Sequence, residues 1–143
     1  MSSHIIKEVQ KLTKRFNTNC PFKLAEALGI HILFEDLGST LGYYNQHFRI
    51  KIIHINQNES EQKQEFICAH ELGHAILHPQ ANTPFLKRYT LYSTDKMELE
   101  ANLFAVGLLF SNEKYDGQLS IREAVEEYGV PEKIISNSLD CAE

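Results

Sequence analysis

The segment His70-Glu-Leu-Gly-His74 places two metal-ligating imidazoles and a carboxylate at helical spacing. Residues four apart on an α-helix differ by about 400° of rotation and about 6 Å of rise, so His70 and His74 project toward one point. Glu71 lies roughly 60° around the helix from His74, near enough to hold a water beside a metal ion without entering its inner shell. The pattern predicts metal-assisted hydrolysis, with Glu71 as the catalytic carboxylate.

The residues around this motif are almost all apolar, which predicts a buried helix. Two imidazoles and a carboxylate are costly to bury without partners, and a metal ion would satisfy all three. Gly73 costs about 1 kcal/mol in a helix interior, so another element is expected to approach the backbone there. The apolar neighbours are Phe66, Ile67, Ala69, Leu72, Ala75, Ile76 and Leu77.

A catalytic zinc usually takes three protein ligands, so a third ligand is expected from elsewhere in the chain. His78 occupies the next i+4 position, about 12 Å along the helix from His70, which is too far to share one ion. We interpret His78 as a residue that supports a ligand from outside the inner shell or that ends the helix. Cys68 points to another face and is interpreted as a small core residue.

The better candidate for a third ligand lies in a second helix, expected over 95–110. There Glu98 and Asn102 share one stripe with the small residue Ala101, so Glu98 is predicted to reach the metal and Asn102 to orient a ligand histidine. Glu100 is the rival ligand, about 200° from Glu98 and on a different face from Asn102, so helical geometry favours Glu98. Alternatively, both glutamates are solvated first-turn residues favoured by the helix dipole.

These paired motifs resemble the ImmA/IrrE family of zinc-dependent metallopeptidases, over roughly residues 20–140. The resemblance rests on Phe66-x-x-Ala-His-Glu-Leu-Gly-His74, His78, Glu98-x-Glu-Ala-Asn-x-Phe-Ala105 with Leu108-Leu109, and the strand-like Ile52–Asn56. Members typically end the second motif with a proline where this chain has Ser111, which affects the end of the helix and not the site.

The family likeness implies a small zincin-like, gluzincin-like metallo-endopeptidase of the short phage or mobile-element type. It implies His70, His74 and Glu98 as ligands of one Zn²⁺ ion and Glu71 as the catalytic carboxylate. Two imidazoles and a carboxylate suit zinc best, although other divalent ions would compete.

The family likeness also implies a protein substrate, a helix-turn-helix transcriptional repressor whose cleavage relieves repression. A second hypothesis is a metal-stabilised antirepressor that sequesters this partner without cutting it, but an intact Glu71 favours catalysis.

Length and composition are typical of one domain over 1–143, with a helix over 1–18 and a helical segment over 118–143. The chain has 143 residues, 43% of them hydrophobic and 23% charged. It has neither an apolar run near the ~18 residues of a membrane span nor a signal-like hydrophobic stretch at its beginning. Its three cysteines, an odd number, favour reduced thiols and a cytoplasmic location.

Hydrophobic periodicity predicts an α+β fold with N-terminal helices, a short mainly antiparallel sheet and a metal-binding helix packed on a second Glu-bearing helix. Turn signals at Gly38 and at Asn45-Gln46-His47 separate the strands. Helices are expected over 3–16, 21–28, 61–77 and 95–110, with further helices toward the carboxyl end, and strands over 30–34, 40–45 and 48–55.

The segment 79–94 has two prolines and no clear period, and it directly follows the metal motif. Long loops beside active sites often bind substrate, but scattered aromatics packing on the core would give the same pattern. The strand over 48–55 would offer a sheet edge for an extended substrate if it is outermost. Substrate contacts are expected among Phe85, Lys87, Arg88, Tyr89 and Tyr92, and an oxyanion donor among Tyr43, Tyr44, His54, Tyr89, Tyr92 and Tyr115.

The region Ile121–Ile135 has the outline of a DNA-reading helix-turn-helix. Its second helix offers Lys133 as a cation against Glu132 and Asp140, and the chain carries a formal net charge of −5. This balance is a poor match for phosphate, so direct nucleic-acid binding is not expected. Packing against the catalytic domain is the favoured interpretation.

Overall fold

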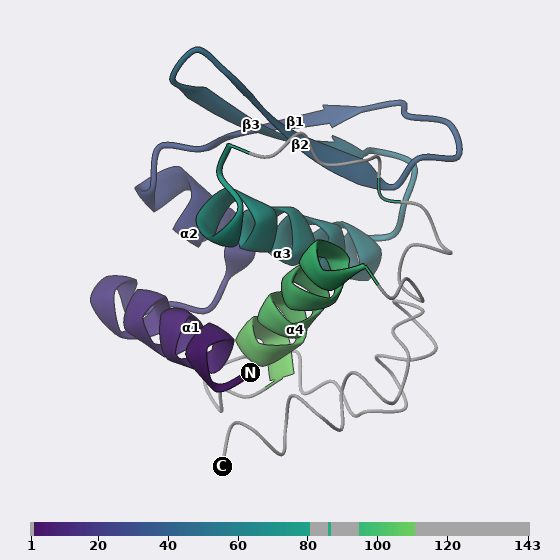
Figure 1. The fold of residues 1–143 in the computed structure, drawn as a ribbon. Coiled ribbons are helices and arrows are strands. Elements are labelled where there is room, and N and C mark those ends of the chain that lie inside the picture. Colours follow the sequence, from purple (N-terminus) through teal and green to yellow (C-terminus); the bar gives the residue numbers. More distant parts are fainter. Residues whose placement is uncertain (1, 81–85, 87–94, 111–143) are drawn as a thin grey trace.

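The computed structural model describes residues 2–80, 86 and 95–110 (Figure 1). The expected segment 118–143, the helix-turn-helix outline, Tyr115 and nearly all of the loop after Gln80 lie outside these residues, and with them Phe85, Lys87, Arg88, Tyr89 and Tyr92. The α+β class is confirmed, and the metal-motif helix has the predicted bounds. The elements are α1 (Ser2–Phe16), α2 (Pro21–Ala27), β1 (His31–Glu35), β2 (Gly42–His47), β3 (Ile50–Asn56), α3 (Glu61–Leu77) and α4 (Lys96–Phe110).

The three strands form a mixed sheet in the order β1-β3-β2, where a mainly antiparallel sheet was expected: β2 pairs antiparallel with β3, but β1 pairs parallel with it. Residues 36–41 cross the end of β3, and the β2–β3 hairpin then brings β3 back between the other two strands. This path makes β3 antiparallel to β2 and parallel to β1, a pairing that strand patterns alone do not reveal. The register pairs His31 with Ile52 and Glu35 with Asn56 in one ladder, and Gly42 with Ile55 and His47 with Ile50 in the other.

The hairpin turn falls at Phe48 and Arg49, not at the predicted Asn45-Gln46-His47. Tyr44 pairs with Ile53, and both side chains are buried in the core. Strand pairing in this register continues to His47, so β2 extends through the predicted turn. Phe48 takes a φ of 56°, a left-handed conformation that non-glycine residues seldom adopt, and its side chain is 86% exposed. Burial on one face of β2 therefore outweighed the local turn signal.

Helix α3 lies between the sheet and α4, while α1 packs against α4 on the far side (Figure 1). Apolar residues surround α3 because both of its sides are covered, and every residue from Phe66 to Ala75 is buried, as predicted. None of the described helices is long and apolar enough to cross a membrane. The core between the layers includes Tyr44, Ile53, Ile55, Ile67, Leu72, Phe104 and Leu108.

Two glycines permit the closest approaches to α3. A Cβ on Gly73 would lie 3.1 Å from Cβ of Phe104, so α4 does approach the α3 backbone there, as the sequence predicted. A Cβ on Gly42 would lie 2.5 Å from Cγ2 of Ile67 and 2.6 Å from the carbonyl oxygen of His54. Because one of these neighbours is backbone, β2 has no room for a side chain at Gly42.

Gly42→Ala is expected to lower the free energy of unfolding by about 1–3 kcal/mol, because the added methyl group must displace a strand or a helix. Urea denaturation with an unchanged m-value measures this loss. Ser39→Ala, in the exposed connection that precedes β2, is the control and should change stability by less than about 0.5 kcal/mol. Equal stability of Gly42→Ala and the wild type would contradict the tight packing of β2 on α3.

Candidate metal centre

Capping interactions begin the two helices that carry the candidate site. Ser60 accepts a hydrogen bond at its Oγ from the Lys63 backbone N–H, which starts α3. Asp95 accepts at Oδ1 from the backbone N–H groups of Met97 and Glu98, at 3.0 and 3.3 Å. The second cap orders the first turn of α4, which carries Glu98.

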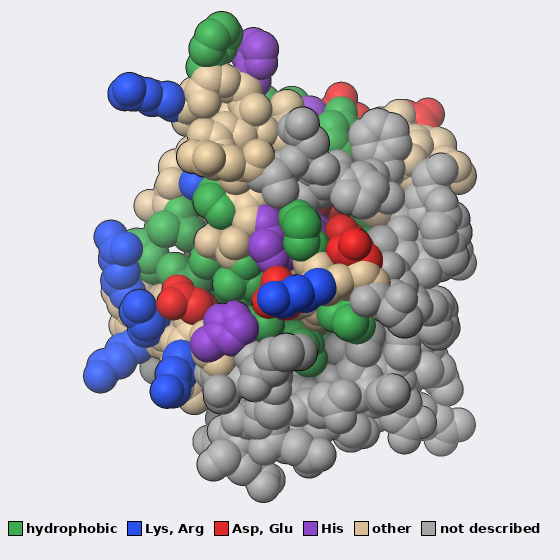
Figure 2. Space-filling view, in the orientation of Figure 1, with side chains coloured by type: hydrophobic (Ala, Val, Ile, Leu, Met, Phe, Trp, Pro, Cys, Tyr) green, Lys and Arg blue, Asp and Glu red, His purple; other side chains and the backbone are tan. Residues whose placement is uncertain are grey.

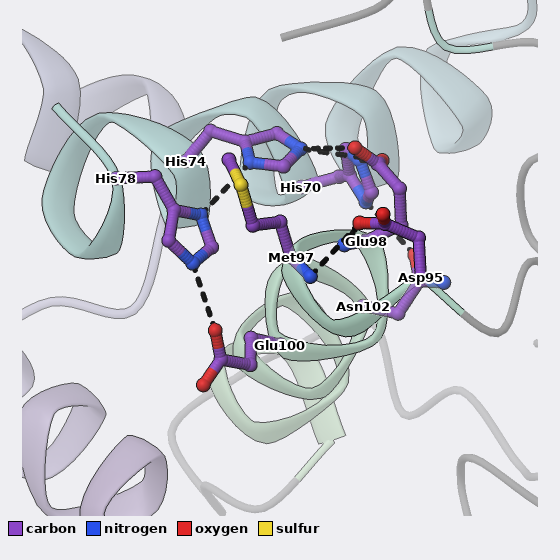
Figure 3. Close-up of polar contacts among 8 residues, drawn as sticks. All are labelled: His70, His74, His78, Asp95, Met97, Glu98, Glu100 and Asn102. Carbon is purple, nitrogen blue, oxygen red and sulfur yellow. Dashed lines mark hydrogen bonds and ion pairs between the residues drawn. The ribbon is translucent and has the colours of Figure 1, made fainter. Parts of the chain in front are cut away.

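The carboxylate of Glu98 contacts both histidines of the motif (Figure 3). Its Oε1 lies 3.0 Å from His70 Nε2, and its Oε2 lies 3.2 Å from His74 Nε2. Two ligands of a tetrahedral ion, each about 2.1 Å from the metal, lie about 3.4 Å apart. All three side chains are at most 4% exposed, so the structure brings these atoms together at a spacing that suits one shared cation.

Glu71 completes this buried group. Ligand atoms of His70, Glu71 and His74 all lie within 4.8 Å of one another. Both carboxylate oxygens of Glu71 are buried and have no hydrogen-bond partner among the described residues. An orphaned, fully buried carboxylate is costly, which points to a cation or a polarised water at this position.

Burial and charge shift the two carboxyl groups in opposite directions. Burial raises the pKa of Glu71 to about 8, with His74 opposing the shift and Glu98 adding to it. Burial also acts to raise the pKa of Glu98, but hydrogen bonds and charge from His70 and His74 outweigh it and lower that pKa to about 2. Near neutral pH the site therefore combines one anionic carboxylate with one that holds its proton.

The hydrogen bonds of His70 test whether a metal fits. His70 Nδ1 lies 2.8 Å from Asn102 Oδ1, and its Nε2 faces the Glu98 carboxylate. A neutral imidazole has a single N–H and cannot donate to acceptors on both sides. Nε2 therefore requires a cation, either a proton or a metal ion, and a histidine, histidine and carboxylate set is one that zinc prefers.

The rival glutamate has a different partner. Glu100 Oε1 lies 2.9 Å from Nε2 of His78, and Nδ1 of His78 lies 3.1 Å from Nδ1 of His74. Glu98 and Glu100 therefore face different histidines, in keeping with their wide angular separation on α4. The sequence pointed to His78 through its i+4 spacing from His74, but not to its pairing with Glu100.

Two of the three described oxyanion candidates lie on the face of the sheet away from α3. His54 lies between the core residues Ile53 and Ile55 on β3, so it projects from the opposite face of the sheet. There it contacts Glu35 and Asn45 and stacks on Tyr43. Tyr44 is buried and donates its hydroxyl to the carbonyl oxygen of Pro79 at 2.8 Å. Strand alternation thus removes Tyr43 and His54 from consideration as oxyanion donors.

Charged side chains of both signs lie on the face of the molecule shown in Figure 2. Histidine, acidic and basic side chains lie together near its centre, and further Lys and Arg side chains lie over α1. The basic residues of α1 are Lys7, Lys11, Lys14 and Arg15.

The chain belongs to the Peptidase_M78 family, the IrrE N-terminal-like domain, whose model matches residues 25–140. It is 48% identical over 102 residues to uncharacterized immunity region protein 2 of Bacillus phage phi105, covering 71% of this chain and 65% of the relative. It is 37% identical over 114 residues to metallopeptidase ImmA of Bacillus subtilis strain 168, covering 78% of this chain and 66% of the relative. The chain thus spans just under two thirds of the length of these curated relatives, and its family supports a metallopeptidase-type function and a metal cofactor.

The pKa of Glu71 predicts how the stability of the metal-free protein depends on pH. Because its folded pKa of about 8 exceeds the ordinary 4.5, the folded state holds a proton that the unfolded state releases between these values. The free energy of unfolding should therefore fall as pH rises from about 5 to 8, by at most about 1.4 kcal/mol per pH unit.

Urea unfolding in the presence of a chelator measures this slope, and Glu71→Gln should lack it because an amide does not titrate. Glu98 contributes in a separate window, since its lowered pKa makes stability fall only on acidification from about 4.5 to 2. Parallel pH profiles of the wild type and Glu71→Gln between pH 5 and 8 would refute the raised pKa.

Proposed function

We propose that this chain is a zinc-dependent endopeptidase. The observation that carries the proposal is the convergence of His70, His74 and Glu98 at the separations of shared ligands, beside a buried Glu71 whose oxygens lack a described partner. A purely structural zinc site needs no general base. The family and the likeness to a metallopeptidase support the same class of reaction.

Each residue of the centre has a separate role in this proposal. His70 and His74, through Nε2, and Glu98 would hold the ion, and Asn102 would orient His70. Bound zinc supplies a Lewis acid that polarises a peptide carbonyl and lowers the pKa of water. Glu71 has a pKa of about 8 in the metal-free protein, and a cation bound beside it would lower that pKa and leave the carboxylate ionised. It would then take a proton from the attacking water and deliver it to the leaving amine.

The substrate that we propose is a helix-turn-helix transcriptional repressor, cut to relieve repression. The likeness to an immunity region protein of a phage and to a metallopeptidase supports a role in repressor regulation. This function places the chain in the cytoplasm, where it would meet its partner. The alternative is a metal-stabilised antirepressor that sequesters the repressor, whereas the net charge of −5 disfavours direct DNA binding.

Glu98→Ala is expected to lower zinc affinity by more than about 100-fold. Loss of a ligand should weaken binding more than the roughly 10–100-fold loss that follows mutation of a residue hydrogen-bonded to a ligand. Competition with a chromophoric chelator gives the affinity, and metal analysis should find one zinc per wild-type chain. Glu26→Ala, on the exposed part of α2, is the matched control and should bind zinc as the wild type does. Undiminished zinc affinity of Glu98→Ala would exclude Glu98 as the third ligand.

Glu71→Gln is expected to keep its zinc and to lose about 10²–10⁴-fold in cleavage rate, because the general base is gone. Co-expression with a candidate helix-turn-helix repressor, followed by gel analysis of that repressor, measures cleavage. Cleavage that needs Glu71 supports the endopeptidase. Tight binding without any cleavage by the wild type would favour sequestration, and full activity of Glu71→Gln would overturn the mechanism.

A further inference from the structure

A continuous line of hydrogen-bonding groups runs from α4 to the candidate metal centre (Figure 3). Glu100 Oε1 lies 2.9 Å from His78 Nε2, and His78 Nδ1 lies 3.1 Å from His74 Nδ1. The exposed fractions of these side chains are 17% for Glu100, 12% for His78 and 1% for His74. The line therefore leads from a partly buried carboxylate to the fully buried interior of the site.

The chemistry of the three groups sets the direction of each hydrogen bond. A carboxylate can only accept, so the proton between Glu100 and His78 belongs to His78 Nε2. Neutral His78 then has a lone pair on Nδ1 and accepts from Nδ1–H of His74. His74 is left with a lone pair on Nε2, the nitrogen that faces Glu98.

The opposite direction is disfavoured. If His78 donated from Nδ1, its neutral ring would turn an unprotonated Nε2 toward the Glu100 carboxylate, which offers no proton to share. Nε2 of His74 would then carry the proton, and a protonated nitrogen cannot bind a metal ion. Through His78, the charge on Glu100 thus selects the tautomer of His74 whose Nε2 carries no proton and can bind a metal ion.

We propose that Glu100 is a positioning residue which, through His78, holds His74 in the tautomer that presents Nε2 to the metal. This role rests on the proposed function, because it presumes a metal at His70, His74 and Glu98. The two ligand histidines are oriented differently, since a neutral amide, Asn102, holds His70 directly. The other oxygen of Glu100 lies 3.9 Å from Nε2 of His4 on α1, beyond hydrogen-bond distance, so His78 is its stronger contact.

Glu100→Gln tests the role, because an amide can donate as well as accept and no longer selects one tautomer of His78. Its zinc affinity, from chelator competition, should fall by about 10–100-fold, the range for partners that orient a ligand histidine. Glu26→Gln makes the same change in charge on α2 and should leave zinc affinity unchanged. Wild-type affinity in Glu100→Gln would overturn the positioning role.

A double-mutant cycle separates positioning from attraction through space. In the His78→Ala background, Glu100→Gln should change zinc affinity by less than about 2-fold, because the connecting ring is gone. The same fold-change in both backgrounds would overturn the role and leave simple electrostatic attraction. If His78→Ala fails to fold, the tautomer of His78 in the wild type decides the matter.

Long-range ¹H–¹⁵N correlation spectra of the zinc-loaded wild type report that tautomer. His78 should carry its proton on Nε2, and a proton on Nδ1 would overturn the role because His78 could not then accept from His74. The proposed function fails separately, when the wild type itself binds no zinc. Tight zinc binding by both the wild type and Glu100→Gln would refute only the positioning role of Glu100 and leave the proposed function standing.

Discussion

The structure depends on how four ionisable side chains are kept out of water between α3 and α4. His70, Glu71, His74 and Glu98 are all buried, and burial of such groups is tolerated only where they satisfy one another or hold a cation. The surrounding layers produce this burial: the sheet covers one side of α3 and α4 covers the other. Gly73 allows Phe104 to pack against the α3 backbone, and the same approach brings Glu98 to both histidines.

The first turns of α4 serve two purposes because neighbouring residues on a helix point in different directions. Glu98 turns inward to the Nε2 atoms of His70 and His74, while Glu100, two positions on, reaches His78. His70 and His74 lie on α3 and His78 is the residue that caps its end, whereas Glu98 and Glu100 lie on α4. The relative placement of the two helices therefore sets nearly every polar contact of the centre. Changes to the α3–α4 packing should therefore act on the site even when no site residue is altered.

Local patterns predicted the helices well. The bounds of α3 were correct, because its N-cap at Ser60 and the proline at 79 lie within a turn of its ends. The sheet was predicted less well. Its mixed pairing depends on the path of residues 36–41 across β3, and its hairpin turn moved to Phe48 because the burial of Tyr44 and Ile53 set the register. Tyr43 and His54 were among the oxyanion candidates because the sequence does not show which face of the sheet packs on α3, and the structure places both on the other face.

The sequence by itself determined that His70 and His74 share one face of a helix, that Glu71 lies beside them, and that Glu98 and Glu100 point apart. These relations follow from the rise and rotation of a single helix, which depend only on local backbone geometry. The tertiary structure alone decided which glutamate meets which histidine and that both oxygens of Glu71 are buried without a described partner. Such contacts join residues more than twenty positions apart, so they arise from the packing of α3 against α4, which no local pattern encodes.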